Sequence, residues 1–535
     1  MNELIHMGVR GLRSFGYKLN PIPFRKINIY VGQNSCGKST YLRTFPLLRQ
    51  SVESDTRFPI LWYAGHGSYV DFGNFESALH DSGDAIHFDF KLKISPAVSS
   101  KNQSNLLMEH YYISSGHGSP TPISYHVDLS ISLKKEGSAL ITTIALQSEG
   151  SKVELNYSAD DVISLIASND KHEIVEQFST PLQITKGSLI PTGVFRGRQI
   201  TIKSINIPRF VPTNTVRQES LTALSKYLHA FHHKSKQLKN VRDSLNYLAL
   251  GSKKQLSRNL KALFSSDKYF IKKFEENSEE IVDVTFTYLL AKNIGTFWES
   301  ADETLKKFYS GVRYLGPLRA SAERFYRHQD LQISEVDHTG ANLPMVINSL
   351  SEDHKAELTE WVKNNFGFDL RLETTGLHYA LLIKEDSDSN YHNVSDMGFC
   401  YSQILPVIVS IWLELVGDRD DKPSTPAWFR VKASRTIVIE QPELHLHPAL
   451  QYKFGSAIAK VASLVKDRDY NFVIETHSKH LIDAIGESIS SNLIDEDQVN
   501  ITLFEKKSSG ISDIALSGFD SDGYLKDWPA GFLSA

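Results

Sequence analysis

The run of eight residues from Gly32 to Ser39 constrains the fold of this chain more than any other feature. It reads GQNSCGKS, the spacing of a loop whose backbone amides turn inward around phosphate groups. In such a loop the lysine reaches the β and γ oxygens, and the serine hydroxyl ligates Mg²⁺. An apolar stretch at 27–31 predicts a buried strand before the loop, and 39–53 predicts a helix after it. We therefore expect a nucleoside triphosphate and Mg²⁺ at Gly32, Asn34, Ser35, Cys36, Gly37, Lys38, Ser39 and Thr40.

The rest of the chain alternates between strand and helix patterns. Period-two hydrophobicity predicts an antiparallel sheet from four strands, at 86–94, 123–133, 139–146 and 152–157. Helical spacing replaces it from about Pro212 to Tyr309. Buried strands are predicted again at 311–319, 436–440 and 472–476. The chain is therefore expected to be an α/β protein.

Composition excludes some classes of protein. The net charge is −4 and the isoelectric point about 6.6, so no global basic field indicates nucleic acid. No apolar run approaches the roughly 20 residues of a membrane span, and the N-terminus has no basic leader before an apolar core. The two cysteines, Cys36 and Cys400, are too few for a disulfide framework. We expect a cytoplasmic protein with no membrane partner.

One segment departs from this balance. Between residues 217 and 273 there are thirteen Lys or Arg but only three acids, Glu219, Asp243 and Asp267. Clustered basic side chains are the first requirement for binding nucleic-acid phosphates. A solvated helical arm has a similar lysine content, although it usually mixes in acids. Both interpretations stay open.

Several polar residues near the predicted C-terminal strands could complete a nucleotide site. Glu440 ends a buried strand, where an acid holds Mg²⁺ directly or through water. His477 follows the next strand, at a position suited to the γ-phosphate. Ser402 is expected at a helix start, before the apolar stretch 404–415. Taken singly, each also has an ordinary structural explanation.

Read in order, these elements resemble an ABC-type P-loop ATPase head of the branch shared by SMC and RecF-like proteins, the overcoming-lysogenization nucleases and bacterial antiphage ATPases. The resemblance rests on the loop, on Glu440, on the run 443–448 (ELHLHP) and on His477. It implies ATP and Mg²⁺ as cofactors, with Ser39 and Glu440 on the metal side and His477 as the switch histidine. Ser402 and Gln403 resemble the end of the signature motif, which in these heads closes on the ATP of a second protomer. A homodimer is thus implied, or a higher oligomer.

The resemblance also suggests how the chain is divided. Residues 1–95 are expected to form the N-terminal half of the head and 96–211 an antiparallel β subdomain. A basic helical insertion is expected at 212–310, and the C-terminal half of the head at 311–535.

Two departures from the family pattern matter. The residue after the strand-end acid is usually a glutamate that activates water, and here it is Gln441. Because an amide cannot accept a proton, we expect tight ATP binding with slow hydrolysis unless Glu443 substitutes. The signature-like loop carries Cys400 where glycine is commoner, which reduces backbone freedom.

Within the branch, the chain most resembles the ATPase subunit of Septu-type or retron-associated antiphage systems. Its total length, the helical insertion, Gln441 and the expected lack of a fused nuclease carry this resemblance. The run 314–319 (YLGPLR) resembles a block of these bacterial ATPases, and the run 527–532 (DWPAGF) resembles the ending of the antiphage group. It implies an HNH-type nuclease partner and, in the retron form, a reverse transcriptase with its RNA-DNA product. The segment 217–273 is then the candidate contact for nucleic acid.

Three rivals remain: a repair or recombination ATPase that clamps DNA directly, a transporter ATPase subunit, and an enzyme with its own nuclease activity. For the last, 58 residues follow His477, which is short for a nuclease domain. Asp520 and Asp522 could form a two-metal pair, but the glycines beside them indicate a tight turn. No intrinsic nuclease activity is expected.

Overall fold

The computed structural model describes residues 2–528 except 57–58, 66–67, 82, 97–122, 138, 159–160, 170–173, 179–186, 192–195, 202–207, 214, 247, 318, 330–332, 417–434 and 465–469. Leu318 of the run 314–319 and the last four residues of the run 527–532 lie outside these residues.

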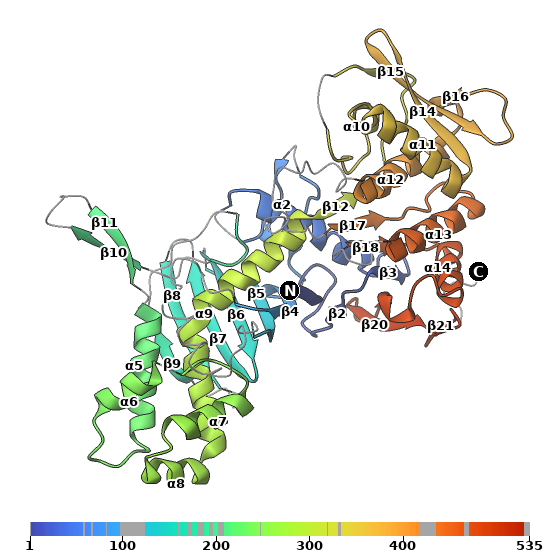
Figure 1. Ribbon diagram of the computed structural model, residues 1–535. Helices are drawn as coiled ribbons and strands as arrows, with labels where there is room; N and C mark the ends of the chain where they lie inside the picture. The colour runs from blue at the N-terminus through green and yellow to red at the C-terminus, as the bar shows by residue number, and fades with distance from the viewer. Residues whose placement is uncertain are drawn as a thin grey trace.

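A mixed sheet of seven strands carries the phosphate-binding loop (Figure 1). In spatial order its strands are β12 (Val312–Leu315), β17 (Arg435–Glu440), β18 (Tyr470–Glu475), β3 (Ile27–Gly32), β19 (Val499–Lys506), β20 (Ser512–Phe519) and β21 (Leu525–Lys526). The five strands from β12 to β19 are parallel, and the last two are antiparallel. All the strands expected in this part of the chain are present.

Both faces of the mixed sheet are buried, because alternate residues of its strands enter different cores. Val438 and Val473 join the core that contains residues of α2 (Thr44–Glu53) and α9 (Ser278–Ser310). Ile439 and Ile474 face the other core, with α12 (Phe399–Val416), α13 (Pro448–Leu464) and α14 (Lys479–Ser490). Helices on two faces explain why the strands read as continuous apolar runs.

A second, antiparallel sheet of eight strands lies beside the mixed sheet. Its spatial order is β2 (Ile22–Pro23), β1 (Glu3–Arg10), β4 (Ala85–Ile94), β5 (Tyr125–Glu136), β6 (Ala139–Ser148), β7 (Ser151–Ser158), β8 (Asp161–Ser168) and β9 (Ile174–Phe178). β4 pairs with β5 along its whole length. The boundary expected between residues 95 and 96 therefore runs through one sheet, which joins the N-terminal strands to the later ones.

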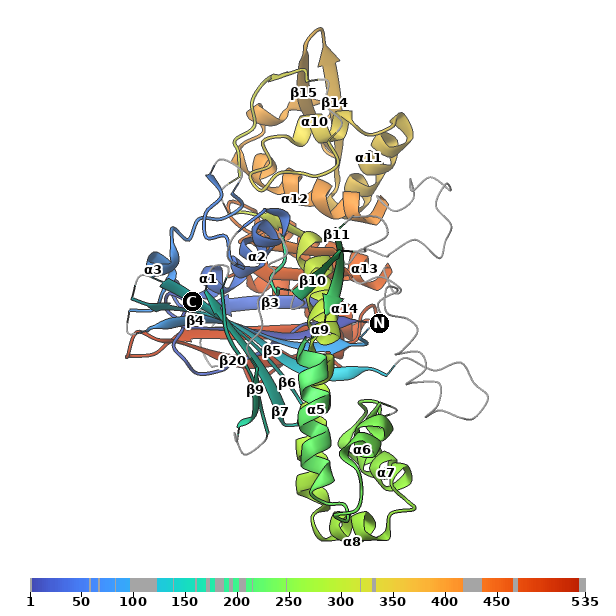
Figure 2. The same ribbon diagram turned by 90° about the vertical axis from the view of Figure 1, so that its left-hand side faces the viewer.

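The helical segment begins after the hairpin of β10 (Arg196–Thr201) and β11 (Pro208–Thr213). It consists of α5 (Thr215–His229), α6 (Leu238–Leu245), α7 (Lys253–Leu263), α8 (Lys268–Glu276) and α9. Figures 1 and 2 show α5–α8 projecting beyond the sheets, whereas α9 runs back along the antiparallel sheet to α2. Only part of the insertion is thus an arm; α9 belongs to the core of the head.

At the opposite end lies a small lobe (Figure 2). It contains β13 (Tyr326–Arg327), α10 (Leu343–Asn348), α11 (Glu352–Phe366), β14 (Phe368–Thr375), β15 (His378–Glu385) and β16 (His392–Asn393). Helix α12 connects it to the mixed sheet. Among the described residues α12 is the one helix long and apolar enough to cross a membrane, with mean hydropathy 1.7, yet 72% of it is buried inside the protein. It is therefore accounted for as a core helix, and the expected α/β class with an antiparallel subdomain is confirmed.

Candidate functional site

The loop from Gly32 to Ser39 connects β3 to the short helix α1 (Lys38–Leu42). Two of its residues have left-handed backbones, Ser35 with φ 61° and Gly37 with φ 101°. A side chain at Gly37 would also collide with Ser512 Oγ, 2.7 Å from the position of a Cβ. Left-handed residues turn successive amides toward one side, which is the geometry of an anion-binding nest. The expected helix at 39–53 is present as α1 and α2.

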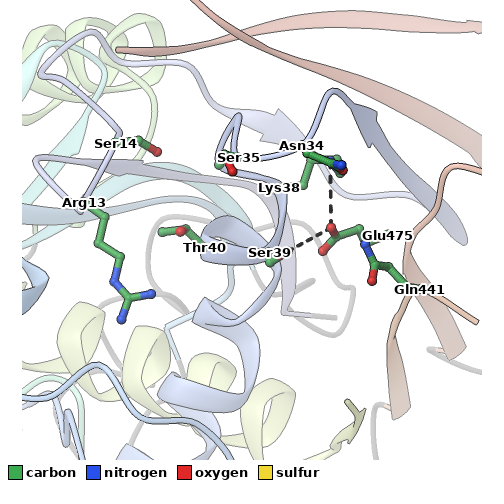
Figure 3. A pocket seen from close by; sticks show the side chains of 10 residues that line it. Arg13, Ser14, Asn34, Ser35, Lys38, Ser39, Thr40, Gln441 and Glu475 are labelled. Carbon is green, nitrogen blue, oxygen red and sulfur yellow. Dashed lines mark hydrogen bonds and ion pairs between the residues drawn. The ribbon is translucent and has the colours of Figure 1, made fainter. Parts of the chain in front are cut away.

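A cavity of about 260 Å³ opens over this loop (Figure 3). Its walls are Arg13, Ser14, Asn34, Ser35, Gly37, Lys38, Ser39, Thr40, Gln441 and Glu475. Seven of these ten residues were expected from the sequence; Arg13, Ser14 and Glu475 were not. The cavity therefore joins four separate segments of the chain: 13–14, 34–40, Gln441 and Glu475.

The lysine of the loop is held by the loop itself. Lys38 Nζ donates to the carbonyl oxygens of Gly32 at 3.0 Å and Gln33 at 2.7 Å, and lies 4.0 Å from Glu475 Oε1. The ammonium group is buried, so its charge depends on these oxygens. A phosphate group entering the cavity would offer it a stronger, charged acceptor.

The acid beside the loop serine is Glu475, at the end of β18. Ser39 Oγ donates to Glu475 Oε1 at 2.8 Å. Burial raises the pKa of Glu475 to about 7, and the neighbouring carboxylate of Glu440 adds to the rise. The sequence offered a signal for Glu475, because it ends an apolar strand just as Glu440 does.

Glu440 does not line the cavity. Arg43 binds both of its carboxylate oxygens, at 2.7 and 2.9 Å, and the hydroxyl of Tyr314 donates to Oε2 at 2.8 Å. Glu440 is only 2% exposed and the side chain of Arg43 is 34% exposed, so this ion pair is buried on the Glu440 side and ties the end of α1 to β12 and β17. The structure does not bring Glu440 into contact with Ser39, its expected partner at the metal.

Gln441 is the one expected catalytic residue in the cavity wall. Its backbone is left-handed, with φ 46°. The backbone nitrogen of Gln441 donates to the backbone carbonyl oxygen of Glu475 at 2.9 Å. Glu443 lies outside the wall, and its Oε1 accepts from the backbone nitrogen of His477 at 2.6 Å. Desolvation, and next the charge of Lys38, lower the pKa of His477.

The signature-like residues are engaged within the protein. Ser402 lies in the first turn of α12, where its hydroxyl donates to the carbonyl oxygen of Phe399 at 2.7 Å. The amide of Gln403 makes reciprocal hydrogen bonds with the backbone of Arg319, at 3.1 and 3.2 Å. Gln403 is buried, so in this structure it braces the loop after β12. Neither residue lines the cavity.

Two further loop residues, Gly32 and Cys36, pack against each other inside the protein. The thiol of Cys36 is buried and packs 2.7 Å from where a side chain at Gly32 would begin. Burial raises the pKa of this thiol. Cys36 and Gly32 therefore support the fold of the loop and do not line the cavity.

Arg13 and Ser14 reach the cavity through long-range contacts, which no local sequence pattern predicts. They follow β1, and β20 holds them in place, because Ser512 donates from its backbone nitrogen to Ser14 O at 2.8 Å. The guanidinium of Arg13 lies 4.3 Å from the centre of the Phe72 ring. A cation at this wall adds positive charge to that of Lys38.

The site fits a magnesium nucleoside triphosphate. A glycine loop, Lys38 and Arg13 offer amides and positive charge to phosphates, and Ser39 with Glu475 offers the oxygen ligands that Mg²⁺ prefers. Glu475 Oε2 is buried without a hydrogen-bond partner, as expected of a group that awaits a ligand.

The aspartate pair near the C-terminus forms a turn. Asp520 Oδ1 accepts from the backbone nitrogens of Asp522 and Tyr524, at 3.0 and 2.8 Å. Among the described residues no group of three or more His, Cys, Asp or Glu side chains could hold a metal ion.

A family model described as "AAA ATPase domain" matches residues 5–482. No curated protein matches the chain. Solved structures similar to it include an Smc head domain with an extended coiled coil, bound to the C-terminal domain of ScpA, from Pyrococcus furiosus (11% identity, 96% of each chain covered, TM-score 0.33). Another is the SMC head domain from Thermotoga maritima (11% identity, 96% of this chain and 98% of that chain, TM-score 0.32). The family match includes the loop, Gln441 and Glu475.

Proposed function

The chain belongs to the family of AAA ATPase domains, and on this premise we propose that it binds ATP tightly, hydrolyses it slowly and acts as a regulatory subunit. The observation that carries the proposal is Gln441 in the wall of the nucleotide cavity. Phosphoryl transfer to water needs a group that positions the water, and rapid turnover benefits from one that accepts its proton. An amide can do the first and not the second.

The other carboxylates near the cavity have existing partners. Glu440 is bound by Arg43 and Tyr314, and Glu443 accepts from His477. Glu475 binds Ser39 and lies near Lys38. These contacts support slow turnover, with the bound nucleotide acting as a signal.

We further propose that the signal is passed to a separate effector in an antiphage defence complex. The sequence runs 314–319 and 443–448, with Gln441 after the strand-end acid, support this assignment. The proposed complex contains a homodimer joined through two ATP molecules and an HNH-type nuclease. In a retron-associated form it also contains a reverse transcriptase with its RNA-DNA product.

The decisive experiment compares the purified chain with the chain co-expressed with a candidate HNH-type nuclease. We expect co-purification, turnover well below about 1 per second, and DNA cleavage that depends on ATP binding. Lys38→Ala should abolish ATP binding and regulation together. The matched control is Lys26→Ala, which also removes a lysine but lies away from the cavity, with its Nζ on Ala462 O.

A second candidate function is a repair or recombination ATPase that clamps DNA directly. The exposed lysines and arginines on α5–α8 favour it, since they need no partner protein to meet phosphates. Strong stimulation of the isolated chain's ATPase by DNA, without any co-purifying nuclease, would select this function and reject the regulatory subunit.

A further inference from the structure

Two glutamates end neighbouring strands beside the phosphate-binding loop, and they have different surroundings. Glu440 and Glu475 are directly opposite each other in the register of β17 and β18. We propose that Glu475, rather than Glu440, is the carboxylate that holds the magnesium ion together with Ser39. The inference rests on the proposed nucleotide site and assigns its metal ligands.

The strand order favours Glu475. β18 lies between β17 and β3, so the end of β18 is one strand nearer to the loop than the end of β17. Accordingly Glu475 reaches Ser39 at 2.8 Å, and Figure 3 shows its carboxylate between Ser39 and Lys38. A carboxylate already in contact with the loop serine needs little movement to share a cation with it.

The contacts of Glu440 argue against a metal role. Three hydrogen bonds, two from Arg43 and one from Tyr314, occupy its two oxygens. To bind a cation it would have to break these three hydrogen bonds, and the buried hydroxyl of Tyr314 would lose its acceptor. Glu440 is therefore assigned as a positioning residue that fixes Arg43, at the end of α1, to the sheet.

Glu475 keeps a free oxygen. Oε1 accepts from Ser39, whereas Oε2 is buried without a hydrogen-bond partner. The side chain is 1% exposed, so solvent does not compensate that oxygen. Mg²⁺ is a hard cation that is commonly bound by one or two carboxylates together with nucleotide phosphates, and Oε2 is placed to serve it.

The test measures metal binding separately from nucleotide binding and from turnover. The full chain is loaded with a non-hydrolysable ATP analogue, and Mn²⁺ affinity is measured by electron paramagnetic resonance. Glu475→Gln should weaken Mn²⁺ binding by about tenfold or more, and Glu440→Gln by less than about threefold. Glu440→Gln should instead lower the melting temperature, because Arg43 and Tyr314 lose a charged acceptor. Asp513→Asn, at a surface ion pair with Lys18 and Lys507, controls for the loss of one carboxylate.

Nucleotide binding is measured in parallel with a fluorescent ATP analogue in EDTA. Glu475→Gln should still bind it without metal, which shows that the variant is folded. Unchanged Mn²⁺ affinity in Glu475→Gln overturns the assignment, as does an equal loss in Glu440→Gln. If no form of the chain, wild type included, binds the nucleotide, the proposed function fails together with the inference.

Discussion

At the residue scale, the chemistry of the cavity depends on the side-chain amide of Gln441. It is the one residue of the expected catalytic set in the cavity wall. The left-handed backbone at this position already carries a non-glycine side chain, so an isosteric change adds no new backbone cost.

We expect Gln441→Glu to increase ATP turnover by about tenfold or more, since a general base contributes about 100- to 10,000-fold when well placed. Steady-state phosphate release measures the effect. Gln441→Ala is the control and should not exceed the wild-type rate. A glutamate variant as slow as wild type would show that another residue limits hydrolysis.

Local sequence patterns missed Glu475 and Arg13 in the cavity wall, for different reasons. Glu475 could have been found, because it ends a buried strand. Arg13 could not, because its place depends on the contact between Ser14 and Ser512, 498 residues apart. Cys36 and Gly32 were expected to contact the nucleotide, and neither is among the residues that line the cavity.

At the element scale, the arm formed by α5–α8 is the part of the chain with the largest local positive charge. Exposed basic residues occur on α5–α8 and in the loop between α5 and α6: Lys226, Lys234, Lys239, Arg242, Lys254, Arg258, Lys261, Lys268 and Lys272. Exposed acids are few over the same residues. This distribution suits the phosphate backbone more than the base edges of nucleic acid.

Reversing three of these charges, with Lys234→Glu, Lys239→Glu and Arg242→Glu combined, should weaken nucleic-acid binding by about tenfold or more. The slope of log affinity against log salt should also become shallower, by about 0.9 for each DNA phosphate that the variant no longer neutralises. Fluorescence anisotropy across salt concentrations measures both.

The control reverses three exposed lysines outside the arm: Lys460, Lys506 and Lys526. It should leave the salt slope unchanged. Equally weakened binding in both triple variants would mean that total charge, and not the arm, governs binding.

The tip of the arm has a titratable core residue. His232 is buried between Phe264 and Phe270, with its Nδ1 2.8 Å from Asp267 Oδ2 and its Nε2 without a partner. Asp267 also caps α8 by accepting from the backbone nitrogen of Phe270. Burial lowers the pKa of His232, although Asp267 opposes this, while Lys236 and His229 add to it.

A lowered pKa in the folded state means that stability is complete above the unfolded value of about 6.5 and is lost as pH falls through the folded value. We therefore expect α8 to lose hydrogen-exchange protection between pH 7.5 and pH 5, after correction for intrinsic rates. His232→Gln should flatten this dependence, while the exposed neighbour variant His233→Gln should keep it. Unchanged protection in wild type would contradict the role of His232.

At the scale of the whole molecule, the proposed dimer needs a surface through which two copies of the chain contact each other. The N-terminal end of α12 presents Phe399, which is 44% exposed and packs its ring against His445 at 5.0 Å. This end carries the signature-like residues, and the proposed ATP sandwich places it on the nucleotide of a second protomer.

We expect Mg²⁺ and ATP to convert the monomer to a dimer and Phe399→Asp to prevent this, because a charge would be buried in the interface. Light scattering after size exclusion measures the mass. Leu377→Asp, an equally apolar exposed site in the small lobe, is the control and should still dimerise. Dimers of the Phe399→Asp variant would reject this interface; nucleotide binding by the monomer should be unaffected in both variants.

The sequence by itself determined the α/β class, the strand, loop and helix around Lys38, the buried strands β17 and β18, and the amide at Gln441. These follow from hydrophobic periodicity and from loop chemistry that acts over a few residues. The tertiary structure alone decided that β1 joins β4, that Arg13 reaches the cavity, and that Arg43 and Tyr314 occupy Glu440 while Glu475 meets Ser39. The reason is that strand order and buried ion pairs depend on residues hundreds of positions apart, and a local pattern does not contain that information.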